Sequence, residues 1–350
     1  MKEQILGILT CLLALFGCKS ESCDVRALCV RDEIGNYIIK WENPVIKGIA
    51  KLYVSDVPDK FDMNHPAAST SIEDGFIRYI TSDNIQRKYF RITFNDHSPQ
   101  DVAARYTFMD NIQNFRDVGG YKSKKGRQVR WGKLYRSGNI HNFSEQDSIR
   151  LIEAGIKTII DLRTAHEVKE QPIYFPNTQI IHIPIPCGNK EEMNQRILEN
   201  KVRKRDGTLF MEDAYIRFIA NNTEDLGDVF RILLDKKNYP ILISGELGKD
   251  RVGLFISLLF SMLDIPQESI TQEYMSSNRY IDPSFMAKTV SALSTDAQET
   301  MTVLLSVNES FLNIAYREIE NRYGSFDNYR ETGLKISGKN RDRLKDLLLK

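Results

Sequence analysis

The chain has 350 residues, of which 41% are hydrophobic and 27% are charged, and its 48 basic side chains nearly balance its 47 acidic ones. This composition is typical of a soluble globular protein, and the length is sufficient for two domains. A formal charge of +1 gives no sign of the net basic surface that nucleic-acid binding requires, so we expect no nucleic-acid partner.

The first residues form a candidate export signal. An apolar run at 5–17 is too short to span a bilayer core of about 30 Å, which favours a signal peptide over a membrane helix. It ends in Leu15-Phe16-Gly17-Cys18, which resembles the lipobox of bacterial lipoproteins. This resemblance implies a signal peptide over 1–18, a lipid on Cys18 and a chain anchored to a membrane of the bacterial cell envelope. A plain secretory signal, which would give a secreted protein, is the alternative.

Three cysteines follow Cys18 in the sequence. Cys23 and Cys29 are close enough to form a disulfide in an oxidising compartment, but their spacing does not decide whether they pair. Cys187 follows Ile-Pro-Ile-Pro in an expected loop, more than 50 residues before the glycine-containing stretch described below. We therefore do not expect Cys187 to act as a nucleophile there.

Residues 24–96 have the pattern of a small all-β domain. Runs of β-branched and aromatic residues occur at 36–41, 50–54, 75–81 and 88–94, separated by turn residues. Short strands at this spacing predict a β-sandwich. Trp41 and the late run Tyr89-Phe90-Arg91-Ile92 resemble a fibronectin type III or immunoglobulin-like module. We expect a spacer, with a binding module as the alternative, followed by a polar linker at 96–110.

The rest of the chain, residues 104–350, combines buried strands with helices. Ser144 is a natural helix N-cap and Gly155 is a natural stop, so a helix is expected between them. The run at 156–161 then predicts a buried strand. Its last residue, Asp161, would lie at the carboxyl edge of an α/β sheet, where ligands usually bind.

The stretch at 239–263 is organised as strand, turn and helix. Ile241-Leu242-Ile243 predicts a buried strand, Ser244-Gly245 ends it, and an apolar helix begins at about Arg251. In this arrangement successive backbone N–H groups converge near the positive end of the helix and form a cradle for an anion. Arg251 adds a fork of donors that suits the oxygens of a phosphate.

Residues 245–253, Gly-Glu-Leu-Gly-Lys-Asp-Arg-Val-Gly, resemble the phosphate-binding loop of the Cys-dependent bacterial tyrosine and dual-specificity phosphatases. That loop reads His-Cys-x-x-Gly-Lys-Asp-Arg-x-Gly, and here Ser244 and Gly245 stand in place of His and Cys. NFRDVGGY at 114–121, LYRSG at 134–138 and IDLR at 160–163 match the same family in order and spacing. The resemblance implies an α/β domain over 104–350 with a central, mostly parallel sheet flanked by helices.

The resemblance also assigns roles to individual residues. Gly245 occupies the position of the nucleophilic cysteine, Arg251 binds phosphate, and either Asp161 or Asp250 protonates the leaving group. The phosphate-binding residues would be Glu246, Leu247, Gly248, Lys249, Asp250 and Arg251. Lys249 is a candidate for binding a second anion, such as another phosphate on a lipid headgroup. We expect no metal and no cofactor.

Helical patterns surround this stretch. The charged segment at 190–206 is either a solvated helical face or, as the resemblance suggests, a lid over the pocket. Amphipathic patterns predict helices at 211–220, 226–234, 270–279, 297–323 and 340–349.

The missing cysteine decides between the functional hypotheses. A phosphatase of this type attacks phosphorus with a thiolate, and Gly245 has no side chain with which to do so. Ser244 would occupy the position that supports the loop from behind. We therefore favour a catalytically impaired phosphatase-family lipoprotein that binds a phosphorylated protein, a phosphorylated peptide or a phosphoinositide. An active phosphomonoester hydrolase with another nucleophile, and a protein that binds through its β-sandwich, are the alternatives.

Overall fold

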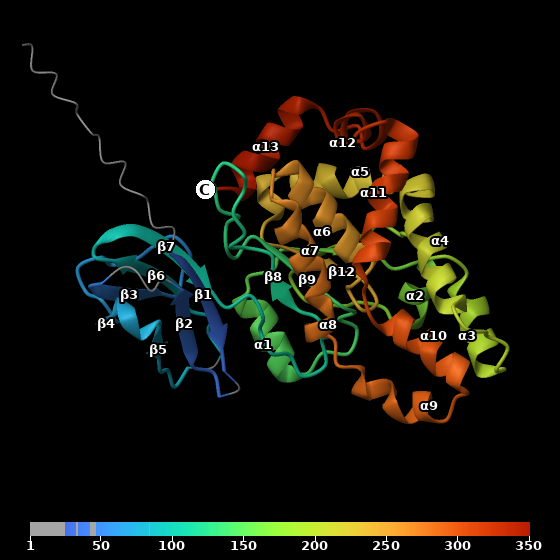
Figure 1. Ribbon diagram of the computed structural model, residues 1–350, viewed down its shortest axis with the longest axis horizontal. Helices are drawn as coiled ribbons and strands as arrows, with labels where there is room; N and C mark the ends of the chain where they lie inside the picture. The colour runs from blue at the N-terminus through green and yellow to red at the C-terminus, as the bar shows by residue number, and fades with distance from the viewer. Residues whose placement is uncertain (1–24, 33, 43–46, 84) are drawn as a thin grey trace, which may run out of the picture.

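The computed structural model describes residues 25–32, 34–42, 47–83 and 85–350 (Figure 1). The expected signal peptide, its lipid attachment site Cys18 and the possible disulfide partner Cys23 lie outside the described residues. In the part of the chain that is described, no helix combines the length and apolar character that crossing a membrane requires.

The N-terminal domain consists of two facing antiparallel sheets, as the sequence predicts. One sheet has the strand order β1-β2-β5 and the other β4-β3-β6-β7. The strands are β1 (Arg26–Arg31), β2 (Tyr37–Glu42), β3 (Ile49–Ser55), β4 (Ala68–Ser71), β5 (Phe76–Tyr79), β6 (Tyr89–Phe94) and β7 (His97–Ala103). Trp41 is buried between the sheets, where its ring meets Phe94 edge-on at 5.4 Å and its indole N–H donates to the Ile72 carbonyl at 2.8 Å.

The predicted linker at 96–110 and the predicted domain end at 96 are wrong. Residues 97–103 form β7, which pairs with β6 along its length, so the sandwich continues to Ala103. Pro99 suggested a break in the sequence, but β7 is an edge strand, and an edge strand tolerates a proline because its outer side needs no ladder hydrogen bond.

Polar contacts fix the two domains against each other. Arg87 of the sandwich forms an ion pair with Asp117 at 2.6 Å and donates to the Ala104 carbonyl at 2.8 Å. The C-terminal Lys350 reaches Asp101 at 2.5 Å, and the indole of Trp131 donates to the Asp101 carbonyl at 3.2 Å. These contacts hold the sandwich against the second domain.

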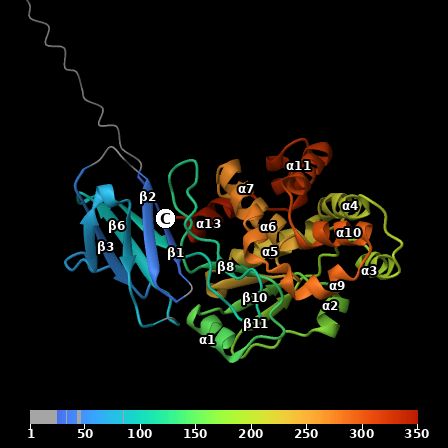
Figure 2. The ribbon, with the colours of Figure 1, turned by 60° about the horizontal axis from the view of Figure 1, so that its bottom comes forward.

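The second domain has the predicted central sheet. Its strand order is β11-β10-β12-β9-β8, in which the first four strands are parallel and β8 pairs antiparallel with β9. The strands are β8 (Arg116–Asp117), β9 (Leu134–Ser137), β10 (Thr158–Asp161), β11 (Gln179–His182) and β12 (Ile241–Ser244). Figure 2 shows α1 on one side of this sheet and α5 and α6 on the other. The domain is thus an α/β fold with helices on both faces.

The helices confirm most of the predicted pattern. They are α1 (Glu145–Glu153), α2 (Ala165–Glu170), α3 (Lys190–Leu198), α4 (Asp206–Asn221), α5 (Thr223–Leu233), α6 (Arg251–Met262), α7 (Gln267–Met275), α8 (Ser277–Tyr280), α9 (Ala287–Ser291), α10 (Thr295–Leu305), α11 (Glu309–Tyr323), α12 (Phe326–Asn328) and α13 (Gly338–Leu348). The single helix expected at 297–323 is wrong, because α10 ends at Leu305 and Asn308 caps the start of α11.

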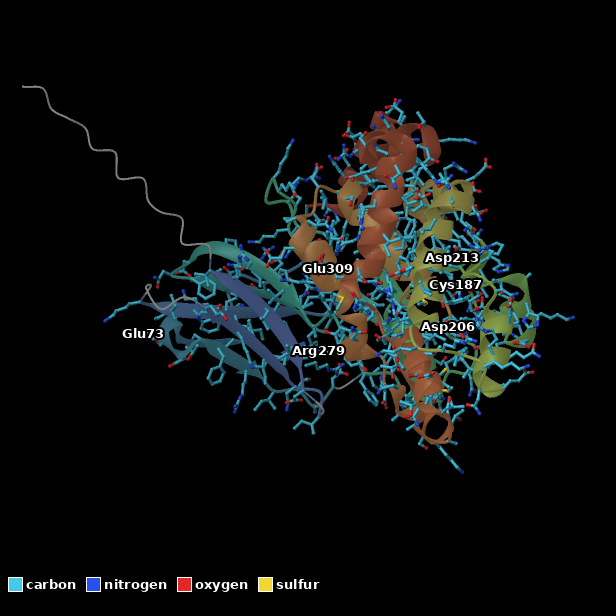
Figure 3. All side chains as sticks on the ribbon, turned by 45° about the vertical axis from the view of Figure 1, so that its right-hand side comes forward. Glu73, Cys187, Asp206, Asp213, Arg279 and Glu309 are labelled. Atoms are coloured by element: carbon cyan, nitrogen blue, oxygen red, sulfur yellow. The ribbon has the colours of Figure 1, made fainter. Side chains whose placement is uncertain are left out.

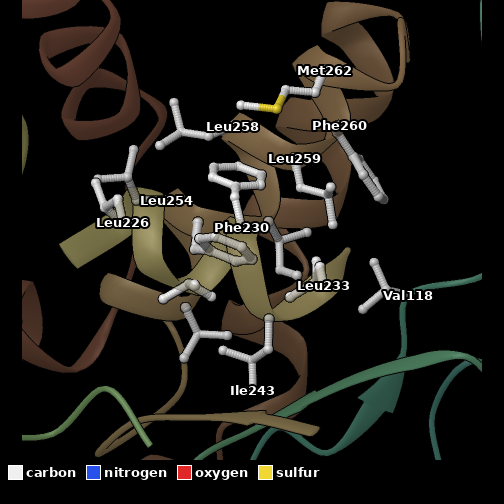
Figure 4. Packing of buried hydrophobic residues seen from close by; sticks show 14 of the residues in the cluster. Val118, Leu226, Phe230, Leu233, Ile243, Leu254, Leu258, Leu259, Phe260 and Met262 are labelled. Atoms are coloured by element: carbon white, nitrogen blue, oxygen red, sulfur yellow. The ribbon is translucent and has the colours of Figure 1, made fainter. Parts of the chain in front are cut away.

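Helix α6 lies in the middle of the core. All of its residues except Ser261 are buried, which matches an apolar sequence with no polar face. Figure 4 shows Leu254, Leu258 and Leu259 of α6 packed with Leu226 and Phe230 of α5. Because the surrounding side chains hold α6 on every side, its first turn has a fixed position relative to β12.

Candidate active site

The candidate site is the loop at 245–250, between β12 and α6. Strand β12 lies in the middle of the parallel sheet, so the loop emerges at the carboxyl edge of the strands. Among the described residues, no acceptor takes a hydrogen bond from the backbone N–H groups of 246–251. Consecutive unpaired donors at a helix N-terminus are the feature that binds phosphate in other proteins.

The sharp bend of the loop depends on Gly248. Its φ is +64°, a left-handed conformation, and a Cβ atom at this position would lie 2.1 Å from the Ser137 carbonyl oxygen. The loop therefore packs directly on the end of β9, with no space for a side chain between them.

We expect Gly248→Ala to destabilise the fold by more than about 2 kcal/mol, since it combines left-handed strain with a clash against backbone. Gly126→Ala is the matched control, because Gly126 has φ +80° but nothing within 4 Å of its Cβ position. Urea unfolding of both variants separates the clash from the strain. Equal losses of stability in the two variants would contradict this account of the loop.

A buried cluster of charges supports the loop from below. Arg116 and Arg136 both bind Glu273, at 2.8 and 2.7 Å, and all three side chains are at most 2% exposed. Arg136 also donates to the Gly248 carbonyl, and Asn114 donates to the carbonyls of Leu247 and Gly248 at 3.1 and 3.0 Å. The sequence motifs at 114–121 and 134–138 therefore meet at the loop and hold its carbonyls away from the cradle.

Burial would raise the pKa of the Glu273 carboxyl, but the charges of Arg116 and Arg136 outweigh it and hold this pKa below its usual range. For Arg136, burial and the like charge of Arg116 lower the pKa to about 10. The Glu273 carboxyl and the Arg136 guanidinium are therefore both charged at neutral pH.

Ser244 faces away from the cradle. It is completely buried, and its hydroxyl donates to the Gly138 carbonyl at 2.8 Å. This agrees with the expectation that Ser244 supports the loop from behind. Gly245, the next residue, marks the floor of the cavity, and a Cβ atom there would meet Val252 Cγ2 at 3.1 Å and the Gly248 nitrogen at 4.0 Å. A Cβ atom at 245 thus requires only a small movement of one methyl group.

Arg251 is held by Glu167 of α2. The two Nη atoms of Arg251 donate to the two carboxylate oxygens of Glu167 at 2.7 and 2.8 Å, a bidentate pair. Nη1 also approaches the Leu162 carbonyl at 3.2 Å. Burial acts against the charged form of Arg251, but Glu167 raises its pKa above the ordinary value. This pair fixes the direction of the guanidinium at the edge of the cradle.

Glu246 turns toward cations at the mouth of the site. Its carboxylate contacts Lys190, the first residue of α3, and lies 3.7 Å from Arg251. Lys190 is also 3.8 Å from Glu167. The carboxylate of Glu246 is therefore compensated by positive charge on the rim of the cavity.

The two candidate proton donors are in different surroundings. Asp250 lines the cavity, where it accepts from the Tyr215 hydroxyl at 3.0 Å and from Lys249 at 2.9 Å. Asp161 is buried and forms a bidentate pair with Arg163, with contacts of 3.0 and 2.8 Å, outside the residues that line the cavity. Of the two, only Asp250 faces the space above the loop.

The side chain of Lys249 is not available to bind a second anion. Its side chain is almost fully buried, and its ammonium group donates to Asp250 and to the Ser306 carbonyl at 2.9 Å. Its available contribution to the cradle is its backbone N–H. The prediction of a second anion at this side chain finds no support in the geometry.

The cavity above the loop is small, with a volume of about 60 Å³. Its polar lining comes from the loop, Lys190 and Cys187, and its apolar edge from Met193, Phe210 and Leu304. Helix α3 packs through Met193 and Ile197 against α10. The charged segment at 190–206 therefore covers one side of the cavity, as a lid would.

Comparison with known proteins identifies the family. The model of the "tyrosine phosphatase family" matches residues 108–350, which is more than half of the chain. This chain belongs to the tyrosine phosphatase family. A relative from Cupriavidus necator, named a "putative tyrosine-protein phosphatase", is 30% identical over 233 residues, which cover 65% of this chain and 83% of that relative. The triple specificity protein phosphatase PtpB from Mycobacterium tuberculosis is 24% identical over 266 residues, which cover 66% of this chain and 95% of PtpB.

A likeness is also found to the solved catalytic core of the yeast PP-IP phosphatase SIW14. It has 18% sequence identity and a TM-score of 0.28, and covers 52% of this chain and 96% of that one.

The phosphatase domain holds two site residues that the sequence did not single out, Glu167 and Glu273, and one that it rejected, Cys187. Glu167 binds Arg251, and Glu273 joins two motif arginines from a distant helix. Cys187, which was set aside because of its distance in sequence, lines the same cavity as Gly245. Figure 3 shows it beside α4, on the side of the molecule away from the sandwich. Burial and the charge of Asp250 raise the pKa of this thiol to about 12, against the opposing charges of Arg251 and Lys249.

The Glu167–Arg251 pair predicts a pH dependence of stability. Burial acts to raise the pKa of Glu167, but its hydrogen bonds to Arg251 lower it from 4.5 to about 2. A lowered pKa in the folded state gives stability that is complete above about pH 4.5 and is lost as the pH falls toward 2. We therefore expect Glu167→Gln to cost roughly 3 kcal/mol at pH 7.

The measurement is urea unfolding of both proteins from pH 7 down to pH 3. The difference in the free energy of unfolding between the unaltered chain and the variant should become smaller as the pH falls below about 4.5. A difference that stays constant or widens would contradict the assigned pKa.

Proposed function

We propose that this member of the tyrosine phosphatase family binds phosphorylated ligands in the cradle at 246–251 and does not hydrolyse them. The proposal rests on the unpaired backbone N–H groups of 246–251, which the buried charges below the loop hold in place. The residue that precedes them, at the position of the family's nucleophile, is Gly245. Glycine removes no donor from the cradle, because the donors belong to the backbone and to Arg251. It does remove the atom that would attack phosphorus.

The ligand class follows from the family and from the cavity. A phosphorylated protein or peptide is the first candidate, and a phosphoinositide is the second. The name of the relative PtpB, a triple specificity protein phosphatase, supports a broad range of phosphorylated ligands. Arg251 and the apolar rim of Met193, Phe210 and Leu304 line the cavity in which the phosphorylated group would lie.

We further propose that the protein is a lipoprotein of the cell envelope, anchored through Cys18. The support is the short apolar run that ends in Leu15-Phe16-Gly17-Cys18. In this arrangement the sandwich separates the phosphatase domain from the membrane.

Hydrolysis through Cys187 is the second candidate, because this thiol lines the cavity. Its pKa of about 12 opposes the idea, because a thiol with a raised pKa is almost entirely protonated at pH 7 and is then a poor nucleophile. Hydrolysis of p-nitrophenyl phosphate that Cys187→Ser abolishes would establish this candidate and overturn the first.

Phosphate should stabilise the folded protein by mass action. At a concentration of one hundred times the dissociation constant, inorganic phosphate is expected to add about 2.7 kcal/mol to the stability and to raise Tm by several degrees. Arg251→Ala should remove the shift. Arg217→Ala is the matched control, because Arg217 is an exposed arginine of α4. An equal rise in Tm for the unaltered chain, Arg251→Ala and Arg217→Ala would show that phosphate binds outside the cradle.

A further inference from the structure

The outer surface of the sheet β1-β2-β5 combines exposed apolar and basic side chains. Alternate residues of a strand share one face, and the strand register places the outward residues in rows. One row runs Val30, Ile38, Arg78 and the next runs Leu28, Lys40, Phe76, so that Ile38 and Lys40 of β2 lie between the β1 and β5 residues. The outer face is defined by Arg26, Leu28, Val30, Ile38, Lys40, Glu42, Phe76 and Arg78. Figure 1 shows the three strands side by side.

The apolar members of this outer face are not part of the sandwich core. The inward residues Tyr37, Ile39 and Trp41 of β2 are buried, and so are Cys29 and Ile77 of the neighbouring strands. Leu28, Phe76 and Val30 are instead 51%, 43% and 40% exposed. Leu28, Val30 and Ile38 adjoin one another, and Phe76 lies across Lys40 from Leu28. Contiguous exposed apolar side chains are a feature of interaction surfaces, whereas single ones are not.

The charge of the outer face is positive. Arg26, Lys40 and Arg78 contribute three positive charges, and Glu42, opposite Arg26, contributes one negative charge, which leaves a net charge of +2. Arg78 lies over the ring of Phe76 at 5.4 Å. Basic and apolar groups mixed on one surface suit a negatively charged lipid surface, because headgroups bind the cations while apolar side chains enter the interface.

The position of the outer face in the chain favours a membrane over a protein partner. The chain reaches β1 after 24 residues that lie outside the described part, and Cys18 precedes Arg26 by only eight residues. Eight residues span at most about 29 Å. A lipid on Cys18 would therefore keep β1 within that distance of the bilayer.

We propose that the outer face of β1-β2-β5 lies on an anionic membrane surface and orients the anchored protein. The proposal rests on the lipid anchor proposed above. Arg26, Lys40 and Arg78 bind lipid phosphates, and Leu28, Val30 and Phe76 enter the interfacial layer. The lipid then attaches the protein, and the outer face determines which side of the sandwich meets the membrane.

The test places a tryptophan at the outer face of the full chain. The two natural tryptophans, Trp41 and Trp131, are both buried, so an added one reports its own surroundings. Leu28→Trp and Phe76→Trp are the reporters. Tyr174→Trp is the control, because Tyr174 is an 83% exposed aromatic residue of the phosphatase domain. Each protein is mixed with vesicles of phosphatidylglycerol and phosphatidylcholine, or of phosphatidylcholine alone.

With anionic vesicles, the fluorescence emission of both reporters should shift to shorter wavelength, and brominated lipids should quench most of it. The emission of the control should neither shift nor be quenched. High salt or the double variant Lys40→Glu/Arg78→Glu should reverse the shift. If the chain floats with the vesicles but the reporters behave like the control, the outer-face proposal is wrong and the anchor stands. If the chain does not float with either vesicle, both proposals are wrong. A shift that grows with protein concentration without vesicles would show self-association and overturn the membrane proposal.

Discussion

Gly245→Cys is expected to hydrolyse p-nitrophenyl phosphate, which we propose the unaltered chain does not do. The new thiol would lie at the N-terminus of α6, among the unpaired N–H groups of 246–251 and near Arg251. These surroundings lower the pKa of a cysteine and favour the thiolate. Removal of the nucleophile from a covalent hydrolase costs on the order of 10⁶ in turnover, so its return should raise the rate by several orders of magnitude.

The structure provides the space that this variant needs. The Cβ atom at 245 would lie 3.1 Å from Val252 Cγ2, so the valine methyl has to move by a few tenths of an ångström. Gly245→Ala is the matched control, because it adds the same Cβ without a thiol. If Gly245→Cys binds phosphate and yet hydrolyses no more than Gly245→Ala, the loop no longer aligns phosphorus with position 245.

Adding histidine at position 244 is a harder change. Ser244 is completely buried with its hydroxyl on the Gly138 carbonyl, so a larger side chain must displace its neighbours. We therefore expect Ser244→His/Gly245→Cys to be less stable than Gly245→Cys, which thermal unfolding of the two proteins measures.

Glu273→Gln is expected to cause the largest loss of stability, about 3 to 5 kcal/mol. Within the described ranges, Arg116 and Arg136 have this carboxylate as their only ionic partner, and all three side chains are buried. Removing the charge leaves two buried guanidinium groups without compensation. Because Arg136 also holds the Gly248 carbonyl, the variant should bind phosphate more weakly as well.

Urea unfolding measures this effect against a matched change at the surface. Glu224→Gln breaks the pair with Lys335, in which both side chains are more than half exposed, and should cost less than about 1 kcal/mol. Equal losses in the two variants would mean that the cluster below the loop contributes no more than an exposed ion pair.

The sequence predicts the architecture of the site well because its motifs are local. Strand β12, the turn at Gly245 and the start of α6 at Arg251 follow from one continuous stretch. The same holds for α1, where the Ser144 capping box and Gly155 determine both ends. The edge strand β7 was missed because a proline normally ends a strand, and only the sheet order shows that no further strand of the sheet follows β7.

The partners of the motif residues could not be predicted in this way. Glu167 is 84 residues from Arg251, and Glu273 is 137 residues from Arg136. Both belong to helices whose own patterns are satisfied by capping or by burial, so no local signal distinguishes them. Cys187 illustrates the same limit. It lies more than 50 residues before Gly245 in the sequence, and yet the two residues line the same cavity in the fold.

The central claim is that the cradle holds a phosphate without cleaving it, and one phosphorus NMR experiment examines both parts together. A phosphotyrosine peptide is incubated with an equal amount of the unaltered chain, and Arg251→Ala serves as the control. We expect the phosphotyrosine resonance to shift or broaden with the unaltered chain only, and to keep its full intensity with no inorganic phosphate signal. Growth of an inorganic phosphate signal that Arg251→Ala prevents, or a resonance that the unaltered chain leaves unchanged, would contradict the account.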